Sequence, residues 1–168
     1  MLQLSPKFKE FILTETKRDF LEGTTAAGKT TVGIFKFMLM VAKSDIKYHV
    51  IAGADLGTVE KNVINNERGL LDQFDGLAEY YPKGQGRIGL SHIKYQTPNG
   101  EKIIYVCGYD NKARWKKVLG SQQGCVYIDE VNTADMEFLR EISHRCKYMM
   151  TTSNPDSPDL LVYKEFIN

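Results

Sequence analysis

A short glycine-rich segment near the amino terminus carries residue types that bind nucleotide phosphates. It matches the pattern G-x-x-x-x-G-K-[ST] at each constrained position, through Gly23, Thr24, Thr25, Ala26, Ala27, Gly28, Lys29 and Thr30. The glycines let successive backbone N–H groups turn toward phosphate oxygens, and the start of a following helix adds partial positive charge. In this pattern Lys29 reaches the β and γ phosphates, and the Thr30 hydroxyl binds a magnesium ion. The alternative is a glycine-rich turn with an incidental lysine.

The flanking residues provide the strand and helix that such a loop needs. Residues 19–22 are short and half apolar, which predicts a strand leading into the loop. Residues 28–44 are long enough for a helix and are apolar nearly all the way round. That pattern predicts a helix buried against a sheet.

A second chemical segment follows an apolar run at residues 125–128. Asp129 and Glu130 come directly after it, and the run itself is typical of a buried strand in a parallel sheet. Ligands of open α/β sheets bind at the carboxyl ends of the strands, the edge that also carries the phosphate loop. We therefore interpret Asp129 as the magnesium-side carboxylate and Glu130 as the base that activates water. Two adjacent acids favour hydrolysis over phosphoryl transfer to a hydroxyl; the alternative is a strand that simply ends in a polar loop.

A third segment begins with the apolar residues 148–151, which predict another buried strand. It leads into Thr152, Ser153 and Asn154, small polar residues that could reach the γ-phosphate or its attacking water. Pro155 ends the strand because it has no backbone N–H to donate. A plain turn would have the same composition.

Taken together, these blocks resemble the ATPase domain of phage terminase large subunits, the motors that package viral DNA into procapsids. The segments that carry the resemblance are residues 21–31, 120–130 and 151–155. The resemblance implies that Lys29, Thr30 and Thr31 belong to the ATP-binding site. It also implies that Asp129 lies on the magnesium side and that Glu130 is the catalytic glutamate.

The same resemblance implies partners and a cellular setting. Thr152, Ser153 and Asn154 would form a coupling motif that links hydrolysis to movement on double-stranded DNA. The cofactors would be ATP and Mg²⁺, and the working form a homo-oligomeric ring. A portal protein and a small terminase subunit would be partners, in the cytoplasm of the host.

The chain departs from this family's pattern in two respects. Many terminases carry an arginine inside the phosphate loop, and residues 24–27 contain none. Large terminases also usually continue into a lid subdomain and a nuclease domain, whereas this chain ends at Asn168, within an apolar-rich segment, residues 160–167, that predicts a helix. We interpret residues 1–168 as a single ATPase domain, either a fragment or a short packaging ATPase.

Composition supports an ordinary globular domain. The 168 residues are 42% hydrophobic and 26% charged, with a net charge of +1, which is not the footprint of a protein that binds DNA over its whole surface. The longest apolar run is far shorter than the about 20 residues of a membrane span. The three cysteines, Cys107, Cys125 and Cys146, are odd in number and lie in apolar runs, so a disulfide framework or a zinc site is not expected. The scattered histidines receive no chemical role.

The remaining segments predict the scaffold. We expect a strand at residues 48–53 and a helix at residues 56–74 that Gly69 kinks or splits. Residues 87–96 and 102–107 predict two strands joined by a turn that contains Asn-Gly, a strong hairpin signal. The predicted fold is a three-layer α/β P-loop NTPase of the ASCE type, with a mostly parallel central sheet and an added antiparallel hairpin.

The most basic stretch, residues 112–117, contains a candidate for charge stabilisation by a neighbouring subunit. Arg114 could act in trans on the γ-phosphate of the next copy in a ring. A solvated basic helix end that contacts DNA phosphates or nothing is at least as good an interpretation. A ring could also concentrate residues 112–117 and 83–87 on one channel.

Three other functions stay open. A small-molecule P-loop kinase would need an arginine cluster after Asn154, which is not evident. A nucleotide-binding module without hydrolysis would be indifferent to loss of Glu130. A helicase-type ATPase would need a second motor domain. Adenine contacts are expected from residues 11–18.

Overall fold

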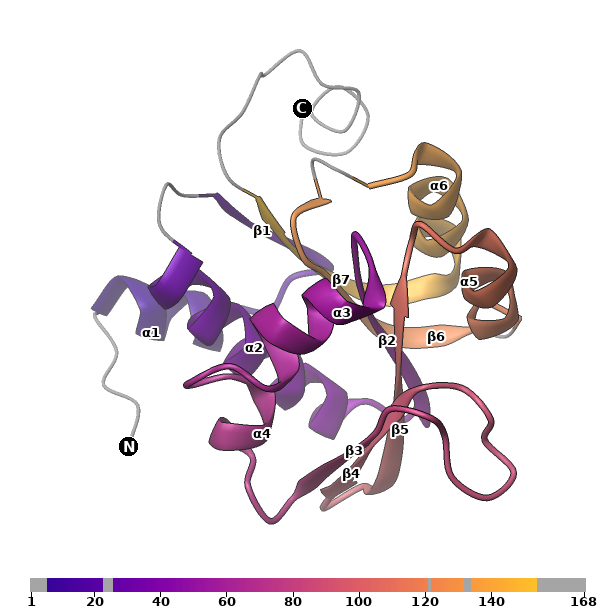
Figure 1. Cartoon of the computed structure of the whole chain (residues 1–168). Coiled ribbons are helices and arrows are strands. Elements are labelled where there is room, and N and C mark those ends of the chain that lie inside the picture. Colours follow the sequence, from indigo (N-terminus) through magenta and orange to yellow (C-terminus); the bar gives the residue numbers. More distant parts are fainter. Residues whose placement is uncertain (1–5, 23–25, 121, 132–133, 154–168) are drawn as a thin grey trace.

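The chain folds around one seven-stranded sheet that has helices on both faces (Figure 1). The computed structural model describes residues 6–22, 26–120, 122–131 and 134–153. In spatial order the strands are β1 (Arg18–Glu22), β7 (Cys146–Ser153), β6 (Gln123–Ile128), β2 (Tyr48–Gly53), β5 (Gly100–Gly108), β4 (His92–Thr97) and β3 (Ala78–Tyr81). Strands β1 and β7, which are far apart in the sequence, therefore lie side by side.

The strands from β1 to β5 in this order are all parallel, and β4 and β3 complete the sheet in antiparallel pairings. Because parallel strands end on the same side, the residues that follow β1, β6, β2 and β5 meet at one edge. The register brings Phe20 of β1 opposite Thr151, and Thr151 opposite Ile128 of β6. This edge is where the sequence places its phosphate loop and its two acids.

Helices cover the two faces of the sheet unequally. One face carries α2 (Ala26–Lys43), α3 (Leu56–Val59), the π-helical turn η1 (Glu60–Ile64) and α4 (Leu70–Gln73), and the other carries α5 (Lys112–Val118) and α6 (Met136–Arg145). The helix α1 (Pro6–Leu13) packs on α2. Side chains of Asp55, Asn111 and Asp135 accept backbone N–H groups and so fix where α3, α5 and α6 begin.

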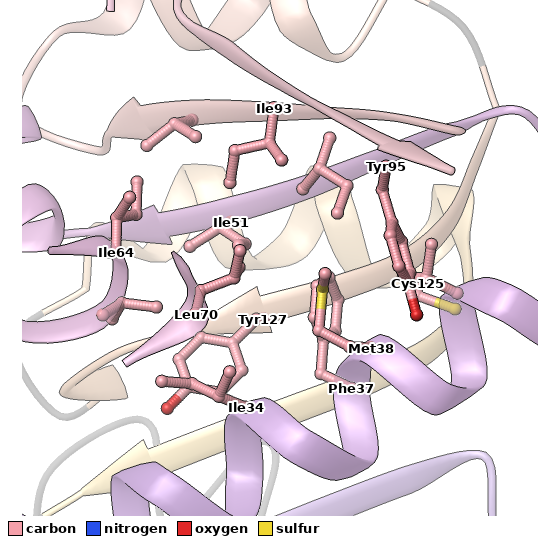
Figure 2. Close-up of a cluster of buried hydrophobic side chains, with 14 of the residues drawn as sticks. Ile34, Phe37, Met38, Ile51, Ile64, Leu70, Ile93, Tyr95, Cys125 and Tyr127 are labelled. Carbon is pink, nitrogen blue, oxygen red and sulfur yellow. The ribbon is translucent and has the colours of Figure 1, made fainter. Parts of the chain in front are cut away.

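Alternate side chains of each central strand point to opposite faces of the sheet and belong to two different hydrophobic cores. In β6, Tyr127 belongs to the core beneath α2, whereas Val126 and Ile128 belong to the core beneath α5 and α6. Figure 2 shows the first core, where the Tyr127 ring lies beside Ile34 and Phe37 of α2. Burial on both faces explains why these strands are continuous apolar runs in the sequence.

Most predicted elements are confirmed with small shifts of their ends. The strand at residues 48–53 is confirmed as β2, and those at 19–22, 125–128 and 148–151 correspond to the longer β1, β6 and β7. The helix predicted at residues 28–44 is α2, which starts at Ala26. The Asn-Gly turn joins β4 to β5 in antiparallel register, as expected.

The helix predicted at residues 56–74 is split, one of the two alternatives given for Gly69: α3 and η1 end at Ile64, and Gly69 caps the separate helix α4. The backbone that precedes Gly69 turns so sharply that an added Cβ there would overlap the carbonyl oxygens of Val63 and Asn66. The predicted antiparallel hairpin is confirmed as β4 and β5. It extends the sheet, because β5 pairs in parallel with β2 and β4 pairs with β3, a strand that the sequence did not reveal.

The helix predicted at residues 160–167, together with Asn154 and Pro155, lies outside the described residues. Within the ranges that the structure describes, no helix combines the length and apolar character needed to cross a lipid bilayer.

Candidate nucleotide-binding site

The predicted phosphate loop joins β1 to α2 at the carboxyl edge of the sheet. Gly23, Thr24 and Thr25 lie outside the described residues. The backbone of residues 26–29 forms the first turn of α2, and the side chains in this turn, Lys29 included, are outside the described part. Thr30 and Thr31 follow, both with buried side chains. The strand, the loop position and the helix are therefore arranged as the phosphate-binding pattern requires.

Asp129 and Glu130 follow β6 in a turn at the same edge. The Asp129 side chain is buried, with 5% exposed, and its backbone N–H donates to the carbonyl of Ala52 at 2.9 Å. Glu130 is half-buried, and its backbone is left-handed with φ 51°. A left-handed conformation is uncommon for a residue with a Cβ, and such strain concentrates at functional sites.

Thr152, near the end of β7, contacts both acidic residues. Its hydroxyl donates to Oδ1 of Asp129 at 2.9 Å and accepts the backbone N–H of Glu130 at 3.3 Å. This is possible because β7 lies directly between β1 and β6. One buried hydroxyl thereby fixes the Asp129 carboxylate and the Glu130 backbone together. Ser153 is also buried, and Asn154 lies outside the described residues.

Tyr127 lies beneath this constellation and was not singled out from the sequence. Its side chain is fully buried, and its ring and hydroxyl approach Gly33 of α2 closely enough to contact any Cβ added there. The hydroxyl faces Thr152 and Thr30 without reaching hydrogen-bond geometry. Burial, with the nearby Asp129 charge as a smaller cause, raises the pKa of Tyr127 well above its ordinary value, so the phenol stays neutral.

Tyr109, after the end of β5, is a second contact that sequence reasoning missed. Its hydroxyl donates to the carbonyl oxygen of Glu130 at 3.1 Å. The only signal for it in the sequence is position, since Tyr109 directly follows a buried strand that ends at Gly108. Nothing in its residue type points to Glu130 before the strand order is known.

The donor set at this edge suits a magnesium ion. The candidate ligands are the Thr30 hydroxyl and the Asp129 carboxylate, which are both oxygen donors. The Tyr127 hydroxyl lies near Thr30, and the Asp129 charge helps to raise the Tyr127 pKa, so both candidates lie near Tyr127. Magnesium typically takes one or two protein oxygens and completes its shell with phosphates and water. Among the described residues, no group of three or more His, Cys, Asp or Glu side chains forms a denser metal site. The chain's residues thus fit the ion that the phosphate-loop pattern implies.

A buried ion pair anchors α2 below the phosphate loop. Lys36 of α2 lies 2.6 Å from the Asp19 carboxylate, and the Tyr148 hydroxyl donates to the same carboxylate at 2.6 Å. Lys36 also donates to the carbonyl of Thr14 at 2.8 Å and lies 4.3 Å from the centre of the Phe11 ring. The segment predicted to contact adenine, residues 11–18, is therefore tied to the helix that starts at the phosphate loop.

Arg114 lies on α5, which packs on the other face of the sheet from α2, the helix of the phosphate-loop pattern. Nearby, Lys112 pairs with Glu137 of α6 at 2.8 Å and Lys116 with the same carboxylate at 3.7 Å. The role predicted for Arg114, action on the γ-phosphate of a neighbouring copy, stays a prediction.

The residues without a predicted chemical role have structural ones. His49 is buried; its Nδ1 accepts the backbone N–H of Cys125 at 2.9 Å and its Nε2 lies 2.8 Å from the carbonyl of Ile46. Burial lowers the pKa of His49 to about 4, partly opposed by the bond to Ile46. Cys107 and Cys125 are buried free thiols, and the Cys146 thiol is free and half-buried.

The order of the strands defines the class of the fold. One strand, β7, is inserted between β1, which precedes the predicted phosphate loop, and β6, which leads directly into Asp129 and Glu130. The predicted three-layer fold with a mostly parallel sheet is thereby confirmed.

The chain is similar in fold to solved structures of phage large terminases. The large terminase of a thermophilic bacteriophage matches with a TM-score of 0.81 and 17% identity, over 99% of this chain and 43% of that one. The same terminase in complex with ATP-γ-S matches with a TM-score of 0.79 and 17% identity, over 98% and 41% of the two chains. The large terminase ATPase domain of Thermus phage P74-26 matches with a TM-score of 0.52 and 14% identity, over 94% and 72%.

These likenesses are in fold, at a low level of identity. The chain spans less than half the length of the thermophilic-phage terminase chains that it matches. No protein-family model matches the sequence, and no curated protein does.

Proposed function

We propose that this chain is the ATPase domain of a viral DNA-packaging motor of the terminase large subunit kind. It would hydrolyse ATP to drive double-stranded DNA into a procapsid. The observation that carries the proposal is the β1-β7-β6 order, in which Thr152 bonds Asp129 and the backbone of Glu130 beside the phosphate-loop helix. A residue on β7 thus contacts both acids, as a coupling element would have to.

The proposed roles follow the chemistry of each side chain. Lys29 binds the β and γ phosphates, and backbone N–H groups of residues 23–31 cradle them. Thr30 and Asp129 would hold Mg²⁺, which when bound neutralises charge on the phosphate oxygens. Glu130 accepts a proton from the attacking water, a contribution that is typically worth about a hundredfold to ten-thousandfold in rate. Thr152, with Ser153 and Asn154, would couple ATP hydrolysis at Asp129 and Glu130 to a movement of β7.

The proposed assembly is a ring of copies around DNA. In such a ring Arg114, on the basic helix α5, would act on the γ-phosphate of the next copy. The portal protein and a small terminase subunit are the further proposed partners, with the host cytoplasm as the setting. A lid and a nuclease domain would belong to other parts of such a protein.

The experiment that tests the proposal is steady-state ATP hydrolysis, measured with and without double-stranded DNA and over a range of protein concentrations. We expect turnover to rise with DNA or with protein concentration, because a neighbour completes the site. Lys29→Ala should abolish it, and Glu130→Gln should lower it at least about a hundredfold while ATP still binds.

Matched controls make the same kinds of substitution at a lysine and a glutamate outside the proposed site. Lys43→Ala changes the last residue of α2, and Glu67→Gln changes an exposed residue before α4; both should keep wild-type turnover. ATP binding with no turnover that depends on Glu130 would contradict a motor and leave a binding module. Transfer of the γ-phosphate to a small hydroxyl acceptor would identify a kinase instead.

A further inference from the structure

The backbone of Glu130 is held in an unfavourable conformation at the centre of the proposed site. Its φ of 51° is left-handed, and within the described ranges Arg68 is the one other residue with a side chain that has a positive φ. Arg68 lies in a surface loop, where its backbone N–H meets the side chain of Asp72. A left-handed non-glycine residue costs about 1–3 kcal/mol and persists only where its surroundings impose it.

Two hydrogen bonds impose this conformation from opposite sides. The N–H of Glu130 donates to the Thr152 hydroxyl on β7, and the C=O of Glu130 accepts from the Tyr109 hydroxyl after β5. Since the atoms lie on both sides of the Glu130 Cα, together they fix the direction in which its side chain leaves the backbone. Thr152 is already part of the proposed coupling segment, whereas Tyr109 has no role assigned.

Tyr109 is itself firmly placed. It is 6% exposed, its backbone N–H donates to the carbonyl of Gly53 at 2.9 Å, and its ring packs on Phe138 with centroids 5.8 Å apart. Because the Tyr109 backbone is hydrogen-bonded and its ring is packed, the position of its hydroxyl is fixed. The hydroxyl is therefore a fixed donor aimed at the Glu130 carbonyl.

We propose that Tyr109 is a positioning residue for Glu130, holding its backbone left-handed so that the carboxylate points at the attacking water. This inference rests on the proposed ATPase function for its effect on rate, but its structural half does not. When the hydroxyl is removed, the Glu130 peptide can rotate toward a right-handed conformation and carry the carboxylate away. A misplacement of about 1 Å in a reacting group can lower a rate by about a hundredfold.

The test is Tyr109→Phe, which removes the hydroxyl and keeps the ring. We expect kcat for ATP to fall by about tenfold to a hundredfold while KM and ATP affinity stay within about twofold. Amide hydrogen exchange at Glu130 and Val131 should become about tenfold faster. Tyr80→Phe is the matched control: it removes a hydroxyl that donates to Glu60 at 2.7 Å on the far side of the sheet, and it should alter neither readout.

A second variant distinguishes positioning from packing. Glycine adopts positive φ freely, so in a Glu130→Gly background Tyr109→Phe should leave the exchange of this turn unchanged. A Tyr109→Phe protein with wild-type exchange would overturn the inference, and so would a loss of rate that follows ATP affinity in equal proportion. If wild-type protein hydrolyses no ATP, the proposed function fails, and the exchange comparison still decides whether Tyr109 holds Glu130.

Discussion

Particular buried polar groups near the two ends of the parallel strands are held differently. Near the amino ends, Asp19 has both Lys36 and Tyr148 as partners, and His49 has a partner at each ring nitrogen. Toward the carboxyl edge, Glu130 is left-handed, and within the described residues the buried Tyr127 hydroxyl has no hydrogen-bond partner. Satisfied groups stabilise a fold, whereas strained or unsatisfied ones persist where function requires them.

This difference indicates that residues that stabilise the fold and residues that carry the proposed chemistry lie at opposite ends of the strands. The amino ends of the strands support the sheet and anchor α2, and substitutions there should act on unfolding. The carboxyl edge holds the proposed chemistry, and the Tyr127 hydroxyl there should contribute little to stability or even lower it. Substitutions at matched positions in the two regions can test the separation.

The largest effect is expected at the buried ion pair. Lys36→Met leaves the Asp19 carboxylate buried without its cation, so the free energy of unfolding should fall by about 3–5 kcal/mol. Adding Asp19→Asn should recover part of this loss, because the uncompensated charge is gone. Urea denaturation of both variants measures it. A loss below about 1 kcal/mol for Lys36→Met would mean that the amino ends are not the stabilising region.

His49 is expected to lower the free energy of unfolding as the pH falls. Its pKa is about 4 in the folded protein, against 6.5 as the ordinary value. Below pH 6.5 the unfolded chain gains a proton that the folded protein does not bind, so this contribution to stability is complete above 6.5 and declines toward pH 4. The decline should reach roughly 3 kcal/mol.

The measurement is the difference in unfolding free energy between wild type and His49→Gln from pH 7 to pH 4. Taking the difference removes the titration of the carboxylates that the two proteins share. A difference that stays constant over this range would show that His49 is protonated as readily in the folded protein as in the unfolded chain.

The smallest and most discriminating effect compares two tyrosines. Tyr148→Phe removes a hydroxyl that donates to the Asp19 carboxylate, and it should cost about 1.5–3 kcal/mol of unfolding free energy. Tyr127→Phe removes a buried hydroxyl that has no hydrogen-bond partner among the described residues, and it should be neutral or slightly stabilising. Thermal unfolding of the pair shows the order directly. Equal losses would indicate that the Tyr127 hydroxyl is satisfied in solution.

Local patterns were enough to predict the parallel strands and the helix of the phosphate loop. Apolar runs bounded by glycine and acids identify β2 and β6, and their burial on both faces confirms the reason. Gly69 indicated a kink or a split in residues 56–74, but the sequence could not decide between them, because one apolar face continues from Val59 and Val63 to Leu70 and Phe74. The strand β3 is four residues long and only partly buried, too little for a periodic signal.

The site was predictable where a residue acts through its own type and spacing. The proposed roles of Lys29, Thr30, Asp129 and Glu130 stay predictions, although the structure brings Thr30, Asp129 and Glu130 to one edge. Tyr109 and Tyr127 could not be found this way, since each meets the site through strands distant in sequence. The left-handed Glu130 also has no sequence signature, because its neighbours impose it.

The place of β7 has a consequence for how the molecule forms. Within the described chain β1 has one strand neighbour, β7, so the strand before the phosphate loop stays unpaired until residues 146–153 have been synthesised. Pairing segments so far apart along a chain closes a very long loop, which slows folding. During translation, therefore, the other strands can assemble first, and the nucleotide-binding edge is completed last. A ribosome-bound chain that stops before Cys146 would lack the strand that carries Thr152, so it could not form the proposed site.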